Sequence, residues 1–208
     1  MLTINRQENP KVLVIWLHGL GADSSDFKDI VEMLNLIDIE FILPDAPIIP
    51  ITLNQGAQMS GWYDIHSLDF NYQDDAGLIS SMGRIEEIIT ERMKRLSKTT
   101  KIIIAGFSQG AALALFIGQS SKIKFDGIIS LSGYQPITVS SNVTKKNIPI
   151  LAMHGLHDDI IDINTAKLSY KDNSPEYFNF KTYEMGHEVI DSQLIDIQQF
   201  LLGIKDYD

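Results

Sequence analysis

The sequence contains no cysteine, no excess of positive charge and no long run of apolar residues. Without cysteine the chain has no disulfide, no thiolate metal site and no cysteine nucleophile. Its formal net charge of −10 argues against a nucleic-acid partner and opposes electrostatic binding to anionic lipid. No stretch reaches the length of a membrane-spanning helix, and the first residues lack the pattern of a signal peptide. We therefore expect a cytoplasmic globular protein, whose contacts with lipid would have to be apolar.

Short apolar segments alternate with helical patterns along the 208 residues. The apolar segments predict buried strands at 12–17, 39–43, 101–105, 127–131, 148–153 and 177–183. Apolar residues recur every three or four positions from Leu78 to Leu96 and again from Ile190 to Ile204, as one face of a helix requires. This alternation predicts the α/β class, with a mostly parallel sheet and helices on both faces. Since no linker or repeat interrupts it, we expect one domain over residues 1–208.

Residues 44–75 do not follow this alternation. They hold three prolines and two glycines and show no sustained period. A segment of this kind in a compact domain is usually functional, so we expect a substrate-facing flap. Its apolar residues, which include Ile48 and Ile49, suit an acyl chain or a transient contact with membrane lipid. The alternative is that they fill a small core of their own.

The pentapeptide G-F-S-Q-G places Ser108 between Gly106 and Gly110. It follows the β-branched run 102–104 and precedes the Ala-rich segment 111–118. In an α/β-hydrolase, Gly-x-Ser-x-Gly forms a sharp strand-to-helix turn that exposes the serine oxygen above the sheet. The glycines are needed where backbone segments come too close for Cβ atoms. The alternative is an ordinary turn in which the serine caps the helix.

A nucleophilic serine needs a base, and the base needs a third group to orient it. In this fold the three follow in the order serine, acid, histidine. Of the five histidines, only His187 follows both the serine and the later acids at a usable distance. The acid is expected in the turn after the fifth predicted strand, where Asp158, Asp159 and Asp162 compete. Spacing alone does not choose between the first two.

An oxyanion hole would complete such a site. Its donors would be the backbone N–H of Gln109, which follows the serine, and a second N–H in an early strand–helix loop. Residues 18–23, H-G-L-G-A-D, form that loop, in which Gly19 and Gly21 free the backbone and Leu20 supplies the amide. The alternative is a phosphate-binding loop, but no Gly-Lys-Ser/Thr follows it.

The motifs described so far belong to a longer set of sequence blocks. The blocks are W-L-H-G-L-G-A-D at 16–23, I-L-P-D-A-P-I-I-P-I-T-L-N-Q-G at 42–56, M-x-x-W-Y-D at 59–64, G-F-S-Q-G at 106–110, L-S-G-Y at 131–134, H-G-x-x-D at 154–158 and M-G-H at 185–187. With these blocks the chain resembles the phospholipase/carboxylesterase family of small α/β-hydrolases, which includes the acyl-protein thioesterases. The blocks keep the family's order over nearly the whole chain.

The resemblance implies that Ser108 is the nucleophile, Asp158 the orienting acid and His187 the base. It implies the same two oxyanion donors, the amides of Leu20 and Gln109. No metal and no organic cofactor takes part in this chemistry.

Substrate contacts are expected from the flap. The resemblance implies that Trp62 lines the substrate pocket, and with it we expect Ile51, Leu53 and Met59 to touch substrate. Only residues 133–147 separate two predicted strands where other hydrolases insert a cap, and fifteen residues are too few for a helical one. We therefore expect an open site with no cap domain.

Three positions depart from the family pattern. Ala111 stands where a second glycine is usual, Asp162 replaces a common proline, and Glu188 replaces the serine that usually follows the histidine. A carboxylate at 188 is expected to hold His187 in its charged form and raise its pKa. None of these changes removes a catalytic atom.

The expected function is that of a serine carboxylesterase or thioesterase, which forms an acyl-enzyme on Ser108. Its partner is an acyl ester or thioester, and a homodimer is compatible with the sequence. One alternative is a lysophospholipase. Another, from a different class, is a non-catalytic binding protein on the hydrolase scaffold.

Overall fold

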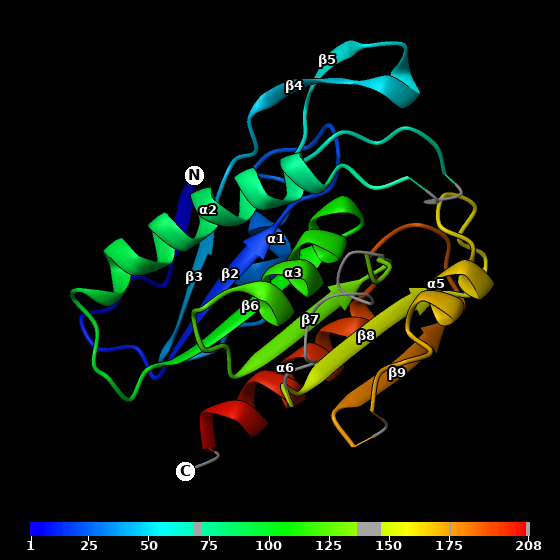
Figure 1. The fold of residues 1–208 in the computed structure, drawn as a ribbon. Helices are drawn as coiled ribbons and strands as arrows, with labels where there is room; N and C mark the ends of the chain where they lie inside the picture. The colour runs from blue at the N-terminus through cyan, green and yellow to red at the C-terminus, as the bar shows by residue number, and fades with distance from the viewer. Residues whose placement is uncertain (69–71, 137–146, 175, 207–208) are drawn as a thin grey trace.

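A computed structural model describes residues 1–68, 72–136, 147–174 and 176–206. In this part of the chain a seven-stranded sheet has the order β1-β3-β2-β6-β7-β8-β9 (Figure 1). Its strands are β1 (Leu2–Ile4), β2 (Val12–Leu17), β3 (Ile39–Leu43), β6 (Lys101–Phe107), β7 (Gly127–Leu131), β8 (Ile150–Gly155) and β9 (Phe178–Tyr183). Neighbouring strands are parallel except for the antiparallel pair β1–β3. The predicted mostly parallel sheet is confirmed.

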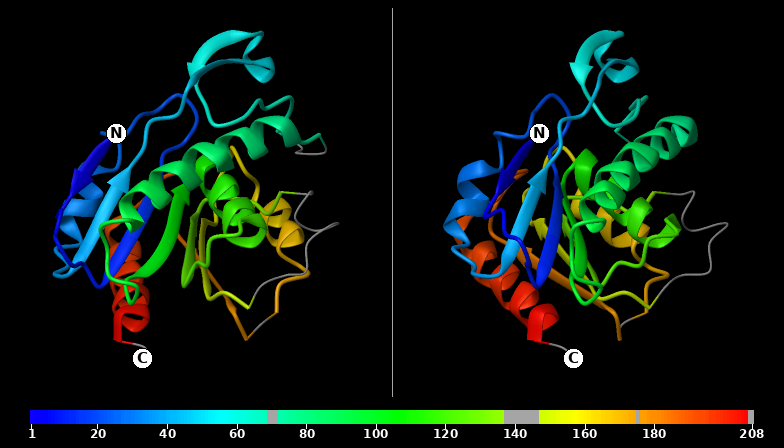
Figure 2. Two further views of the ribbon diagram at one scale, coloured as in Figure 1. Left: turned by 60° about the vertical axis from the view of Figure 1, so that its left-hand side comes forward. Right: turned by 90° about the vertical axis from the view of Figure 1, so that its left-hand side faces the viewer.

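Helices cover both faces of the sheet, as Figure 2 shows. One face carries α1 (Lys28–Met33) and α6 (Asp191–Asp206), and the other carries α2 (Asp75–Met93), α3 (Gln109–Ser120) and α5 (Ile163–Ser169). Successive side chains of a strand point to opposite faces, so β2 contributes to two cores. Leu13, Ile15 and Leu17 pack under α2 and α3, and Val12, Val14 and Trp16 pack under α1 and α6. Within the described ranges, no helix is both long and apolar enough to cross a bilayer.

The observed boundaries differ from the predicted ones at the carboxyl ends of two strands. β6 continues to Phe107, directly before the serine, and β8 begins and ends two residues later than predicted. The short elements β1, α1 and α5 were not anticipated, because three to seven residues carry too little periodicity to be recognised.

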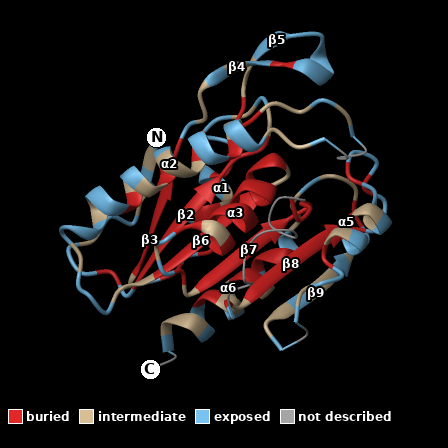
Figure 3. Ribbon diagram, in the orientation of Figure 1, coloured by how far each residue is buried: buried red, intermediate tan, exposed pale blue. Residues whose placement is uncertain are grey.

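The flap segment is partly ordered into a hairpin. β4 (Ile48–Ile51) pairs with β5 (Ala57–Ser60) across the 3₁₀ turn Thr52–Asn54. The hairpin projects beyond the sheet and is mostly exposed, whereas the central strands are buried (Figure 3). Residues 69–71 of the flap lie outside the described residues, as do residues 137–146, on which the expectation of no cap depends.

The sheet topology decides where a site can form. From β2 the chain moves outward to β3, and from β6 it moves in the opposite direction to β7, β8 and β9. β2 and β6 are therefore neighbours at a topological switch point, and Leu17 pairs with Gly106 at their ends. In open α/β sheets the crevice at the carboxyl ends of such strands is the usual binding site.

Candidate active site

The turn that carries Ser108 is sharply bent between β6 and α3. Ser108 has φ 55° and ψ −119°, a conformation that L-residues rarely adopt. A Cβ on Gly106 would lie 2.3 Å from the Gly110 carbonyl oxygen, and one on Gly110 would lie 2.4 Å from the Leu17 carbonyl oxygen. Both glycines are thus required by close backbone approach. This is the geometry of a nucleophile elbow, and it lifts the serine hydroxyl above the sheet.

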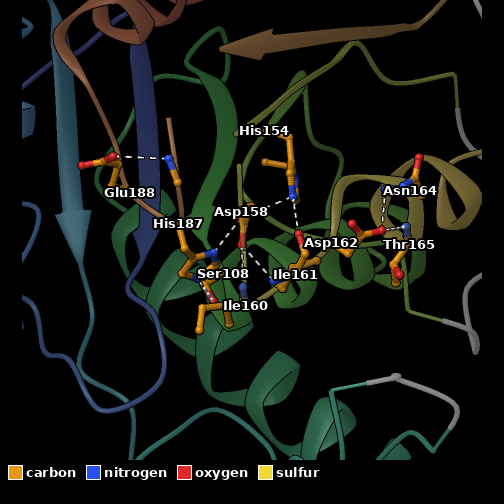
Figure 4. A network of polar contacts seen from close by, with 12 residues as sticks. Ser108, His154, Asp158, Ile160, Ile161, Asp162, Asn164, Thr165, His187 and Glu188 are labelled. Carbon is orange, nitrogen blue, oxygen red and sulfur yellow. Dashed lines mark hydrogen bonds and ion pairs between the residues drawn. The ribbon is translucent and has the colours of Figure 1, made fainter. Parts of the chain in front are cut away.

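Three side chains from separate loops meet above this turn (Figure 4). His187 Nε2 lies 2.9 Å from Ser108 Oγ, and His187 Nδ1 lies 2.8 Å from Asp158 Oδ2. Asp158 follows β8 and His187 follows β9, whose ends are in register at Gly155 and Tyr183. An ionised carboxylate accepts the Nδ1–H, which leaves Nε2 free to accept the serine proton. The structure therefore brings together Ser108, His187 and Asp158, the carboxylate that the family resemblance singled out.

The Asp158 carboxylate is buried and held from several sides. Oδ1 accepts hydrogen bonds from the amides of Ile160 at 3.0 Å and Ile161 at 2.8 Å. Burial alone would raise the pKa of Asp158, but the hydrogen bonds from His187 and these amides outweigh it and leave the pKa below its usual value. His154, also buried, donates from Nε2 to the Ile161 carbonyl at 2.7 Å, and burial lowers its pKa. Asp158 is thus a charged, fixed acceptor for the imidazole.

The competing acidic residues have other places. Asp159 is exposed, and Asp162 is the N-cap of α5, where it accepts from the amides of Asn164 and Thr165. Glu188 accepts from the Gly186 amide at 3.3 Å and points away from the imidazole in Figure 4. Among the described ion pairs His187 is joined to Asp158 alone, and Glu188 forms no ion pair with it. No group of three His, Asp or Glu in the described ranges is arranged to hold a metal ion.

Two backbone amides beside the serine have no acceptor among the described residues. They belong to Gln109, the first residue of α3, and to Leu20, in the loop after β2. The Gln109 N–H has no partner within its helix because the first N–H groups of a helix never do. In this crevice both amides can donate to a negatively charged oxygen.

A largely apolar pocket of about 400 Å³ opens at this site. Its volume lies within the range of roughly 300–1,000 Å³ typical of small-molecule sites. Its lining includes Ser108, Gln109, His187 and Leu20, and the apolar side chains of Leu53, Ile65, Leu68, Phe107, Ile160 and Ile161. The serine therefore faces a cavity that suits an apolar chain.

Comparison with known proteins agrees with this geometry. The family model for phospholipase/carboxylesterase matches residues 2–204. The chain belongs to the phospholipase/carboxylesterase family. It is 38% identical to acyl-protein thioesterase 1 of Yarrowia lipolytica over 75% of this chain and 73% of that protein. It is 34% identical to acyl-protein thioesterase 1 of Saccharomyces cerevisiae over 90% of each chain.

A solved structure of the same fold is acyl-protein thioesterase 2 of Zea mays. It superposes with a TM-score of 0.88 over 98% of both chains at 23% identity, which shows the α/β-hydrolase fold. With the family and its relatives, the chain is a serine hydrolase of carboxylic ester or thioester bonds. The alternative of a non-catalytic binding protein is not supported.

Of the four residues expected to contact substrate, the structure places one at the pocket. Leu53 lines the pocket, but Trp62, Ile51 and Met59 are not among the described residues that line it. Trp62 and Ile51 are buried, and the Trp62 ring N–H donates to the His18 carbonyl at 2.8 Å. Met59 instead lines a separate hollow between the hairpin and residues 21–23. Trp62 is thus a packing and hydrogen-bonding residue in this structure.

Sequence reasoning missed Phe107, which packs against the His187 ring. The ring of Phe107 packs on the His187 imidazole, with 4.8 Å between centroids. The Phe107 ring also packs against the Phe27 ring, with 5.6 Å between their centroids. This contact links the imidazole to the core under α1. The variable position of the Gly-x-Ser-x-Gly pattern gave no sign of this contact, because it depends on where a loop 80 residues later lies.

Proposed function

We propose that Ser108 is the nucleophile of a two-step acyl transfer, with His187 as general base and Asp158 as the orienting acid. Ser108 Oγ attacks the acyl carbonyl while its proton passes to His187 Nε2. The imidazolium then gives that proton to the leaving alcohol or thiol. A water molecule, deprotonated by His187, attacks the acyl-enzyme and releases the carboxylic acid and free Ser108. The single observation that carries this proposal is the continuous hydrogen-bonded chain from hydroxyl to imidazole to carboxylate.

We assign the Leu20 and Gln109 amides to the oxyanion hole. Support comes from their lack of acceptors among the described residues and from their place beside Ser108 in the pocket lining. A donor of this type contributes roughly 3–4 kcal/mol to transition-state stabilisation.

We propose that the substrates are long-chain acyl thioesters or esters, with S-acylated protein as the leading class. The apolar lining of the 400 Å³ pocket supports an acyl chain, and the relatives are named acyl-protein thioesterases. Lysophospholipid is the second candidate, favoured by the same apolar lining. The exposed hairpin residue Ile48 supports a transient lipid contact of the flap.

The nucleophile is tested with Ser108→Ala. We expect hydrolysis of p-nitrophenyl butyrate to fall by at least about 10³-fold, with an unchanged circular dichroism spectrum. A fluorophosphonate probe should label Ser108 in the wild type, as read by peptide mass spectrometry. Retention of activity in the variant would refute the assignment.

The substrate class is tested with a panel of acyl thioesters, oxyesters and lysophospholipids of increasing chain length. We expect kcat/KM to rise with chain length until the pocket is filled. A preference for acetyl esters would contradict an acyl-binding pocket.

A further inference from the structure

We propose that the side chain of Gln109 is a positioning residue for the oxyanion hole. Its hydrogen bonds join the start of α3, which carries the Gln109 amide, to residues 60–63. That segment in turn fixes the loop that carries the Leu20 amide. The inference rests on the proposed function, because it requires the Leu20 and Gln109 amides to bind the oxyanion.

Both polar atoms of the Gln109 side chain make hydrogen bonds. The residue is 1% exposed, and its Oε1 accepts from the Trp62 amide at 3.0 Å while its Nε2 donates to the Tyr63 carbonyl at 2.7 Å. The two partners fix its orientation, because a backbone N–H only donates and a carbonyl only accepts. Any residue other than proline at position 109 would supply the backbone N–H, so the oxyanion donor itself does not require glutamine. The side-chain hydrogen bonds instead tie the start of α3 to residues 62–63.

The same segment holds the loop after β2. The Trp62 indole N–H donates to the His18 carbonyl at 2.8 Å, and the two rings lie 5.0 Å apart. The Gly21 amide donates to the Ser60 carbonyl at 2.7 Å. Leu20 lies between His18 and Gly21, so residues 60–62 hold the backbone on both sides of its N–H. The direction of that donor therefore depends on where this segment lies.

Other bonds fix the segment to the body of the protein but not to the nucleophile. Ser81 of α2 donates to the Trp62 carbonyl, and the hydroxyls of Tyr63 and Tyr134 lie 2.9 Å apart. Among the described hydrogen bonds, those of the Gln109 side chain are the ones that join residues 62–63 to the turn of Ser108. Because a hydrogen bond weakens steeply with distance and angle, loss of this link should misalign the donors for the oxyanion. The effect belongs in kcat, since the oxyanion exists only along the reaction path.

The first test is Gln109→Met, which keeps the backbone N–H and the side-chain length but removes both polar atoms. We expect kcat for p-nitrophenyl butyrate to fall by about 10- to 100-fold, with KM changed less than about threefold. The same factor should apply to every acyl length, because each substrate forms the same oxyanion. An unchanged kcat, or a loss confined to long chains, would overturn the proposal.

The matched control is Gln119→Met on the same helix. Gln119 is also buried, at 2% exposed, and lies ten residues further along α3. We expect this variant to lower the unfolding temperature while kcat stays within about twofold. If it loses as much kcat as Gln109→Met at equal loss of stability, the effect is general and the proposal is wrong.

A second variant keeps the proposal testable if Gln109→Met does not fold. Trp62→Phe preserves the backbone contact with Gln109 but removes the indole donor to His18, so we expect kcat to fall about 10-fold with little change in KM. An unchanged kcat in Trp62→Phe would overturn the proposal. Where Gln109→Met folds, kcat of the double variant should lie within about twofold of that of Gln109→Met, because both changes break one chain of contacts. Multiplicative losses would show independent effects and contradict it.

Fluorophosphonate labelling separates this inference from the proposed function. Labelling of wild-type Ser108, together with full kcat in Gln109→Met, would remove only the positioning role. Absence of labelling at Ser108 in the wild type would remove the proposed nucleophile itself.

Discussion

The turn around Ser108 and the β4–β5 hairpin both contain glycine, but for opposite reasons. At the turn, a Cβ on Gly106 or Gly110 would meet backbone atoms at 2.3 or 2.4 Å. At the hairpin, Gly56 has φ +79° and nothing lies within 4 Å of the position of its Cβ. One region is constrained by packing and the other by its own backbone conformation. The effects of substitutions on the free energy of unfolding and on activity should therefore differ between the two regions.

The largest effect is expected for Gly110→Ala. The added methyl would meet the carbonyl oxygens of Leu17 and His18, which belong to β2 and to the loop of the proposed oxyanion donor Leu20. We expect the free energy of unfolding to fall by about 3 kcal/mol and esterase activity to fall by more than about 100-fold, as measured by urea unfolding and p-nitrophenyl ester hydrolysis.

Gly83→Ala is the matched control for this change. Gly83 lies inside α2 with open space around its Cβ position, so alanine should stabilise the helix by up to about 1 kcal/mol. Wild-type stability in Gly110→Ala would mean that the turn is not packed as described.

The two regions should also respond differently to acid. Burial lowers the pKa of both His18 and His154, which hold the loops beside Ser108, whereas residues 48–60 contain no histidine. Below about pH 6.5 the unfolded chain binds these protons and the folded chain does not, so stability falls as pH falls. The slope is at most about 1.4 kcal/mol per pH unit for each histidine.

His154→Gln should remove the contribution of one histidine, at most about 1.4 kcal/mol per pH unit, from that slope between pH 6.5 and 5. The measurement is urea unfolding at several pH values. His157→Gln serves as the control, because the His157 side chain is 70% exposed and pairs only with the exposed Glu184 among the described ion pairs. Equal slopes in wild type and His154→Gln would show that His154 does not titrate differently on folding.

A smaller effect is expected for Gly56→Ala at the hairpin. Alanine has room there but must adopt a positive φ, which costs about 1 kcal/mol. Thermal unfolding should show this loss, while hydrolysis of p-nitrophenyl butyrate stays within twofold. A loss of activity comparable to that of Gly110→Ala would contradict the separation of the two regions.

The smallest effect on stability is expected for Ile48→Ser. Ile48 is 65% exposed, so the free energy of unfolding should change by less than about 0.5 kcal/mol. If the flap contacts lipid, co-sedimentation with phosphatidylcholine vesicles should decrease. Unchanged sedimentation would argue against that contact.

The same contrast explains what could be read from the sequence. The central strands are continuous apolar runs, and the Ser108 turn obeys a local steric rule, so both were predicted correctly. The choice between Asp158 and Asp159 could not come from spacing, because it depends on which carboxylate meets the Ile160 and Ile161 amides and the imidazole. Only a family resemblance selected it in advance.

The flap shows where such reasoning fails. In the β4–β5 pair, β4 is rich in isoleucine but interrupted by Pro50, and its partner β5, A-Q-M-S, contains no isoleucine. Neither segment shows the regular apolar spacing of a strand or a helix. Trp62 was expected to touch substrate, yet its hydrogen-bond partners include His18 and Gln109, which are 44 and 47 residues away. Contacts of that range are set by the tertiary fold and leave no local pattern.

The position of β9 at the edge of the sheet has a consequence for biosynthesis. His187 follows this last strand, so a growing chain displays its serine hydroxyl long before the imidazole has left the ribosome. A serine without a base is a poor nucleophile. Hydrolytic competence should therefore arise only once His187 has been synthesised and has docked beside Ser108.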